Sequence, residues 1–128
     1  MHCQLRSVDR TLFDGDAVMV VARSALGEFA VMDRHAPLLA VLETSAVRVK
    51  TGDAEEAFAV RGGLLRVERN RVTLLVDEAI PGREVDLEAV ASRLDAVEAA
   101  LGEARDDPRL LRERAYLRAQ RRAGERHD

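Results

Sequence analysis

Short apolar runs separated by turn residues fill residues 1–83. Apolar and polar residues alternate in Val47-Arg48-Val49-Lys50, which is typical of a half-buried strand. Turn signals such as Gly62-Gly63 and Asp14-Gly15-Asp16 separate the runs. With no helical segment between them, these runs predict an antiparallel β-sandwich or barrel. The predicted strands are residues 3–8, 11–13, 18–23, 29–32, 38–42, 46–51, 57–61, 64–68 and 72–77.

Beyond residue 83 the apolar spacing becomes helical. Asp86 is the predicted N-cap of a first helix, and Gly102 is its predicted end. Asp107-Pro108 predicts the start of a second helix, with Gly124 as its stop. The short link predicts an antiparallel hairpin over residues 84–128, after a sandwich domain over residues 1–83. One face of the first helix carries an apolar residue every three or four positions: Leu87, Val90, Leu94, Val97 and Leu101.

The two predicted helices carry opposite charge. Residues 84–107 contain eight acidic and two basic residues, a net charge of −6, whereas residues 108–126 contain seven basic and two acidic residues, a net charge of +5. An exposed ion pair contributes only ~0.2–1 kcal/mol. We therefore expect a hairpin that is closed but able to open. The alternative is that the charges form only a solvated helix face.

Composition excludes several classes of function. The 128 residues have a net charge of −3 and only 3% aromatics, which argues against nucleic-acid binding. The single Cys3 and the scattered His2, His35 and His127 predict neither a disulfide nor a metal site. No apolar stretch approaches the ~20 residues that span a bilayer, and no signal peptide is visible.

Catalytic patterns are equally absent from the sequence. Gly62-Gly63 lies between strands and lacks the helix of a phosphate-binding loop, and no serine sits in a nucleophile elbow. No carboxylates are visibly paired in a predicted cleft. We therefore predict a non-catalytic protein without cofactor. His35, in a loop before an apolar strand, is either a surface histidine or a functional one.

Four segments of the chain carry a recognisable pattern in a fixed order: Val8-Asp9-Arg10-Thr11-Leu12-Phe13-Asp14-Gly15, Gly27-Glu28-Phe29-Ala30-Val31 with His35-Ala36-Pro37-Leu38-Leu39, Ala59-Val60-Arg61-Gly62-Gly63-Leu64-Leu65-Arg66-Val67, and Val72-Thr73-Leu74-Leu75-Val76-Asp77-Glu78-Ala79. In this order they resemble the epsilon subunit of the F-type ATP synthase. The resemblance implies a ten-stranded antiparallel β-sandwich followed by a two-helix arm. Arg34 and Ala30 stand where the family pattern has glycine, so the turn before His35 is expected to differ.

The resemblance also implies a role and partners. The family's subunit belongs to the central stalk, binds the gamma subunit and the c-ring, and rotates with them without performing chemistry. Its extended arm reaches the beta subunits of the catalytic head and inhibits ATP hydrolysis. These properties imply a peripheral protein at the cytoplasmic face of the bacterial cell membrane, which it touches only through the c-ring.

Site residues follow from the same resemblance. Glu28 matches the loop that approaches the c-ring, and Ser7 and His35 match positions near gamma. The extended arm is expected to meet an acidic segment of beta through four arginines on one broad face: Arg114, Arg118, Arg121 and Arg122.

ATP binding to the arm is not expected. Some members bind ATP through a motif in which an arginine follows an aspartate by three positions, but here Ala89 follows Asp86. In the next possible register Glu98 holds that position, and an acid cannot replace a cation that faces phosphate. Two alternatives to the inhibitory subunit remain: a purely structural coupling subunit, and an unrelated nucleic-acid-binding module.

Overall fold

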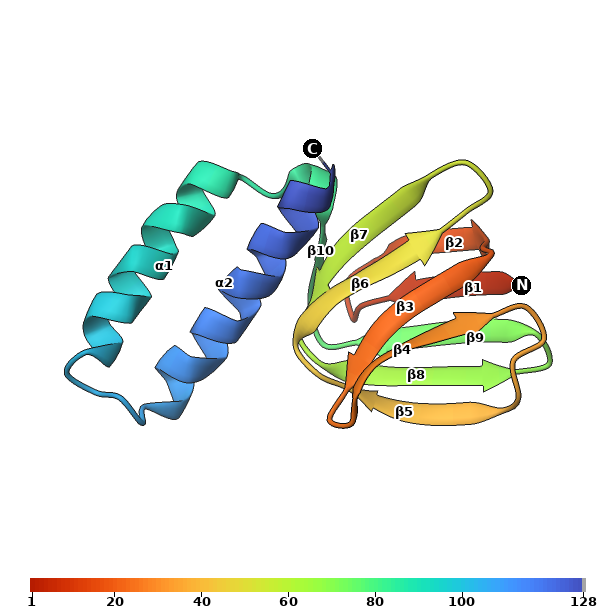
Figure 1. Ribbon diagram of the computed structural model, residues 1–128, viewed down its shortest axis with the longest axis horizontal. Coiled ribbons are helices and arrows are strands. Elements are labelled where there is room, and N and C mark those ends of the chain that lie inside the picture. The colour runs from red at the N-terminus through yellow and green to blue at the C-terminus, as the bar shows by residue number, and fades with distance from the viewer. Residues whose placement is uncertain (128) are drawn as a thin grey trace.

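Two five-stranded β-sheets pack face to face and are followed by two helices (Figure 1). The structure, a computed structural model, describes residues 1–127; residue 128, the end of the predicted hairpin domain, lies outside the described residues. The predicted sandwich followed by two helices is confirmed. The strands are β1 (His2–Arg6), β2 (Thr11–Asp16), β3 (Met19–Ser24), β4 (Gly27–Met32), β5 (Leu38–Leu42), β6 (Ser45–Lys50), β7 (Glu55–Val60), β8 (Gly63–Glu68), β9 (Arg71–Val76) and β10 (Ala79–Pro81).

One sheet is mixed, so the prediction of a wholly antiparallel sandwich is wrong. The first sheet, sheet A, has the strand order β2-β1-β9-β8-β5, and the second, sheet B, has the order β10-β7-β6-β3-β4. In sheet A, β1 pairs with β9 in parallel, with His2 opposite Arg71 and Arg6 opposite Leu75. Alternation of apolar and polar residues reports which face is buried, not the direction of the neighbouring strand.

The core lies between the two sheets. It is formed by every second residue along the strands, whose side chains point inward. Val47 and Val49 of β6 are fully buried, as the alternation predicts. Phe58 is the largest fully buried side chain, and its ring meets Phe13 edge to face at 6.5 Å between centroids. Such an aromatic pair adds about 0.5–1.5 kcal/mol beyond its area burial.

Two strand predictions need correction. Asp14-Gly15-Asp16 is not a turn, because β2 continues through it and Gly15 pairs with Cys3 of β1. The tenth strand, β10, has no counterpart among the strands predicted from apolar runs. It has only three residues, ends in Pro81 and pairs with the end of β7, so it carries too little pattern to be recognised.

The caps of the helices agree with their predicted positions. Helix α1 spans Leu87–Leu101, and the Asp86 carboxylate accepts a hydrogen bond from the backbone N–H of Ala89 at 3.1 Å. Gly102 is the C-cap residue. Helix α2 spans Pro108–His127 and follows Asp107, whose carboxylate accepts from the N–H of Arg109 at 2.9 Å.

Gly124 does not stop α2, so that prediction is wrong. The helix continues to His127, and Gly124 is buried. A Cβ atom at this position would lie 2.8 Å from Cδ2 of Leu87 and 3.0 Å from Cγ1 of Val85. Glycine is therefore used here for close packing against the segment that precedes α1, and not to terminate the helix.

Helix α2 lies between the sandwich and α1 (Figure 1). It packs on the outer face of β6 and β7, whereas α1 packs against α2, through Val90, Leu94 and Leu117. A short 3-10 turn, Gly82–Glu84, joins β10 to α1 and also contacts α2. The helical arm is thus docked on the sandwich through one of its two helices.

Candidate functional site

The seam between α2 and the sandwich is built from small side chains. Ala57 and Ala59 of β7 meet Ala119 and Ala123 of α2, with Tyr116 at one end of the seam. Small residues let the helix axis approach the sheet closely, so the seam has many contacts but little apolar area per residue. At its far end, Gly82 lies so close to the carbonyl oxygen of Ala123 that a Cβ atom there would clash.

Arg61, just after β7, joins the sandwich to α2 in two ways. Its guanidinium carbon lies 4.2 Å from the ring centre of Tyr116, and its Nη2 lies 3.6 Å from a carboxylate oxygen of Glu113. Glu78 holds the same side chain from the sandwich, at 2.9 Å. Burial raises the pKa of Tyr116 to about 12, and the nearby Glu78 adds to the rise. The phenol is therefore neutral at physiological pH.

An exposed apolar row crosses the outer face of sheet A. Val41 of β5 is paired with Leu64 of β8, which is paired in turn with Leu75 of β9. Their exposed fractions are 70%, 44% and 53%. Contiguous exposed apolar side chains of this kind make the outer face of sheet A a candidate surface for contact with another protein.

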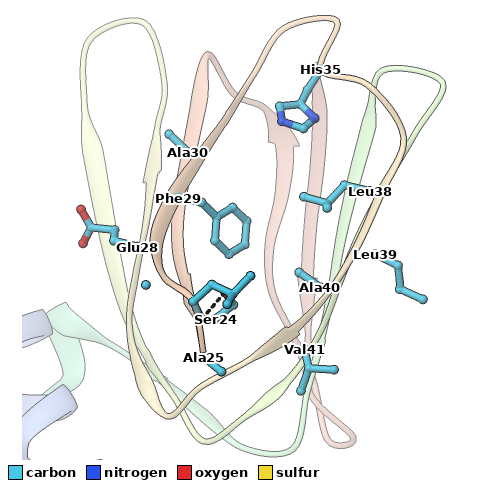
Figure 2. Close-up of a pocket in the computed structure, with 12 residues that line it drawn as sticks. Ser24, Ala25, Glu28, Phe29, Ala30, His35, Leu38, Leu39, Ala40 and Val41 are labelled. Carbon is cyan, nitrogen blue, oxygen red and sulfur yellow. Dashed lines mark hydrogen bonds between the residues drawn. The ribbon is translucent and has the colours of Figure 1, made fainter.

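A groove of about 530 Å³ opens between the edge strands β4 and β5, where the two sheets separate (Figure 2). Phe29 and Leu38 point into it, and His35 lies at one end. The His35 ring nitrogen Nδ1 is 2.7 Å from the carbonyl oxygen of Ala36. Neither β4 nor β5 has a second strand neighbour, so both present unpaired backbone groups along the groove.

The described residues offer no site of metal chemistry: no three His, Cys, Asp or Glu side chains of residues 1–127 lie close enough together to hold an ion. Cys3 is buried, which raises its pKa to about 12 and keeps the thiol protonated. Neither α1 nor α2, as far as they are described, has the length and apolar character of a membrane span.

Comparison with known proteins decides the family. The family described as "ATP synthase, Delta/Epsilon chain, beta-sandwich domain" matches residues 1–82. The chain belongs to the ATP synthase delta/epsilon chain family. The family resemblance predicted from the sequence motifs is thereby confirmed.

Individual members of the delta/epsilon family match over most of their length. The "ATP synthase epsilon chain" of Rubrobacter xylanophilus is 34% identical over 80% of this chain and 70% of its own. The "ATP synthase epsilon chain" of Laribacter hongkongensis is 38% identical over 84% of this chain and 78% of its own. A chain in the cryo-EM structure of the Euglena gracilis mitochondrial ATP synthase, OSCP/F1/c-ring, shares the fold, with a TM-score of 0.74 at 20% identity over 98% of this chain and 77% of that one.

The three residues assigned by the family resemblance to the gamma and c-ring interface do not gather at one place. Ser7 lies in the turn after β1, where its hydroxyl is 3.4 Å from the carbonyl oxygen of Arg10. Glu28 lies in β4 and not in a loop, and its carboxylate is 3.6 Å from Arg48. His35 lies in the loop between β4 and β5, near the opposite end of the sandwich from Ser7 and Glu28. Their interface roles remain predictions.

The turn before His35 places a non-glycine residue in a backbone conformation that favours glycine. Arg34, which replaces the family's glycine, has a φ of 62°, in the left-handed region. Its backbone N–H donates to Oδ1 of Asn70 at 2.7 Å. That hydrogen bond to the β8–β9 turn holds Arg34 in its left-handed conformation.

The four arginines predicted to share one face of α2 have three different sets of neighbours in this delta/epsilon-family arm. Arg114 and Arg118 both reach Glu98 of α1, at 3.6 and 3.4 Å. Arg121 pairs with Glu125 on its own helix at 3.8 Å. Arg122 instead faces the sandwich, beside Glu28 and Arg48. Among the described side chains, Glu98 is thus the one acidic residue of α1 that pairs with the basic helix, fewer than the opposite net charges predict.

Arg61 and the edge groove could not be predicted from the sequence. Arg61 stands in a segment that matches the family, but no local pattern indicates that α2 packs back against β7. The one available signal was that Tyr116 is the single tyrosine in the chain and stands beside the apolar positions of α2. The groove arises from the order of strands in two sheets, which the chain does not display locally.

Proposed function

We propose that this delta/epsilon-family chain is a rotor subunit in the central stalk of an F-type ATP synthase. It performs no chemistry there and couples proton-driven rotation to ATP synthesis. The observation that carries the proposal is the apolar row Val41–Leu64–Leu75 on an otherwise well-packed sandwich. The chain lies at the cytoplasmic face of a bacterial membrane and touches that membrane only through the c-ring.

The apolar row supplies the contact with the gamma subunit. A stalk subunit must transmit torque, so its contact with gamma has to be lasting and largely apolar. Ser7, just after β1, lies at the end of sheet A that carries the row and contributes a polar contact at its rim. His35, at the opposite end of the sandwich, contributes a separate polar contact with gamma. Glu28, near the β3–β4 turn, approaches the polar loops of the c-ring.

The helical arm acts as a brake on ATP hydrolysis. Docking relies on a seam of small residues and on exposed ion pairs such as Arg126–Glu55, at 2.8 Å, which each contribute little. Such a contact supports a two-state element. In the extended arm Arg114, Arg118, Arg121 and Arg122 are free to bind an acidic segment of a beta subunit, where guanidinium groups bind carboxylates in a bidentate manner.

A second candidate is a coupling subunit whose arm stays docked. The close approach of Gly82 to Ala123 and of Gly124 to Val85 favours it, because these contacts fix the end of α2 against the linker to α1. In that case the charges of α2 serve only to keep the hairpin closed.

Removal of residues 105–128 from the chain in the assembled complex tests the brake. Assembly and coupling should persist, because the sandwich core lies wholly within residues 1–83. The rate of ATP hydrolysis should rise. Replacement of Arg114, Arg118, Arg121 and Arg122 by Ala should reproduce much of the rise, and replacement by Lys should give an intermediate rate. An unchanged rate after truncation would leave the second candidate as the function.

A further inference from the structure

The β4–β5 loop, residues 33–37, begins in a tight turn. The N–H of His35 donates to the carbonyl oxygen of Met32 at 3.1 Å and closes this turn of four residues. Arg34 is the third residue of the turn and has a φ of 62°. A positive φ at the third position of a turn favours glycine, and the Cβ atom of an arginine makes it costly. Another contact must therefore offset the cost of this conformation.

The side-chain amide of Asn70 supplies that contact. Its Oδ1 accepts a hydrogen bond from the backbone N–H of Arg34 at 2.7 Å, and its Nδ2 donates to Oδ1 of Asp33 at 2.9 Å. One amide thus holds two consecutive residues of the loop, because a primary amide combines an acceptor with donors. The hydrogen bond from Asn70 is also the largest cause that holds the pKa of the Asp33 carboxyl below its usual value. The carboxylate therefore stays ionised and accepts a charge-assisted hydrogen bond.

Asn70 is presented to the loop from a tight hairpin. Arg69 and Asn70 form the two-residue turn between β8 and β9. Both have a positive φ, 52° and 59°, as two-residue hairpin turns require. Asparagine adopts this left-handed conformation more readily than most residues do. The amide therefore has a fixed origin on sheet A, from which it reaches across to the loop that joins sheet B to β5.

We propose that Asn70 is a positioning residue for His35. Its amide fixes the loop in the conformation that presents the imidazole ring at the end of the sandwich (Figure 2). His35 follows Arg34 directly, so the backbone angles of Arg34 set the direction in which the imidazole leaves the loop. Without the amide, Arg34 relaxes to a negative φ and the ring of His35 turns away. The use of this position rests on the proposed function, in which His35 contacts gamma, whereas the positioning itself does not.

NMR spectra of the full 128-residue chain test the positioning without a partner. Asn70→Gly removes the amide and still permits the positive φ of the hairpin turn, so the chain should remain folded. The ring signals of His35, assigned with a His35→Gln variant, should shift and show greater mobility. Thr51→Ala is the matched control, because the Thr51 hydroxyl bonds to Ala54 within the β6–β7 turn and not to the β4–β5 loop. This control should leave the His35 signals unchanged.

A double-mutant cycle tests whether the amide acts through the backbone of residue 34. Glycine adopts a positive φ without the steric cost, so the loop should need the amide less in the Arg34→Gly chain. Asn70→Gly should therefore change the His35 signals much less in that chain than in the unaltered one. Three results would overturn the proposal: unchanged His35 signals in the Asn70→Gly chain, an equal change in the Thr51→Ala chain, or the same change with and without Arg34→Gly.

Binding of the same variants to the gamma subunit measures the consequence for assembly. Asn70→Gly should weaken the affinity about fivefold, a loss typical of one hydrogen bond. Asn70→Asp, which keeps the acceptor for the N–H of Arg34 but cannot donate to Asp33, should give an intermediate loss. Shifted ring signals with an unchanged affinity would support the positioning and remove His35 from the proposed interface. Failure of the unaltered chain to bind gamma would contradict the proposed function instead.

Discussion

The guanidinium group of Arg61 is stacked on the ring of Tyr116, 4.2 Å from its centre, across the boundary between the sandwich and the arm. The same guanidinium also reaches Glu113, one turn earlier on α2. Arg61 is therefore a sandwich residue that contacts the arm only while α2 is docked. Because Tyr116 is the single tyrosine and the chain has no tryptophan, its fluorescence reports docking directly.

Replacement of Arg61 by Gln should weaken docking of the arm. The variant loses the stacking on Tyr116 and the attraction to Glu113, which together contribute about 0.5–2 kcal/mol at a half-exposed site. Tyrosine fluorescence in a denaturant titration should show that α2 separates from the sandwich at a lower denaturant concentration than in the unchanged chain. Arg105→Gln, in the exposed link between the helices, is the matched control. Equal behaviour of the two variants would mean that Arg61 does not hold the arm.

Docking should weaken at high pH through Tyr116. Its pKa is raised from 10.0 to about 12, so the folded state holds the phenolic proton more tightly than the unfolded state does. This contribution is fully present below pH 10 and is lost as the pH rises toward 12, with a total of about 1–3 kcal/mol. Absorbance of the tyrosinate form gives the pKa directly.

Tyr116→Phe separates this effect from that of Cys3, whose pKa is also raised to about 12 from 9.0. The variant should keep the docked arm and lose only the part of the pH dependence that begins near pH 10. A tyrosinate titration at the ordinary pKa would show that the phenol is not buried in solution.

Gly82→Ala should destabilise the docked arm by about 1–3 kcal/mol, the usual effect of overpacking a close contact. The new methyl group would clash with the carbonyl oxygen of Ala123. This oxygen belongs to the backbone, so no change of side-chain rotamer relieves the clash. Gly52→Ala is the matched control, since a Cβ atom there meets nothing within 4 Å. Thermal unfolding of both variants checks the prediction, and a neutral Gly82→Ala variant would contradict the close packing.

A charge in the apolar row should prevent assembly without unfolding the chain. Leu64→Asp places a carboxylate between Val41 and Leu75 on the outer face of sheet A, where desolvation by a partner would be costly. Co-purification with gamma should be lost, while the free energy of unfolding changes by less than about 1 kcal/mol. Val18→Asp, at a 54% exposed position outside the row, should leave assembly intact.

Local patterns predicted most of the architecture. Alternation marked Val47 and Val49 as buried, and the apolar spacing of Leu87, Val90 and Leu94 marked one face of α1, because each pattern follows the period of its own element. The caps Asp86 and Gly102 could also be predicted from the sequence, since a cap depends on a few neighbouring residues.

Features that depend on distant neighbours could not be predicted in this way. Gly124 has the sequence signature of a helix stop, but its function is to admit Val85 from another segment. The parallel pairing of β1 with β9 and the stacking of Arg61 on Tyr116 likewise join segments that are far apart in the chain. Their geometry is set by tertiary packing, which overrides local preference.

The parallel pairing of β1 with β9 has a consequence for biosynthesis. As the chain leaves the ribosome, β1 can pair with β2 at once, but its other edge has no partner until residues 71–75 have emerged. During that interval β1 is an open edge strand, the kind of element on which nascent chains aggregate. His2 and Arg6 place polar and charged groups at its two ends, and such groups oppose edge-to-edge pairing. Helix α2, which is made after all ten strands, then closes onto a sandwich that is already complete.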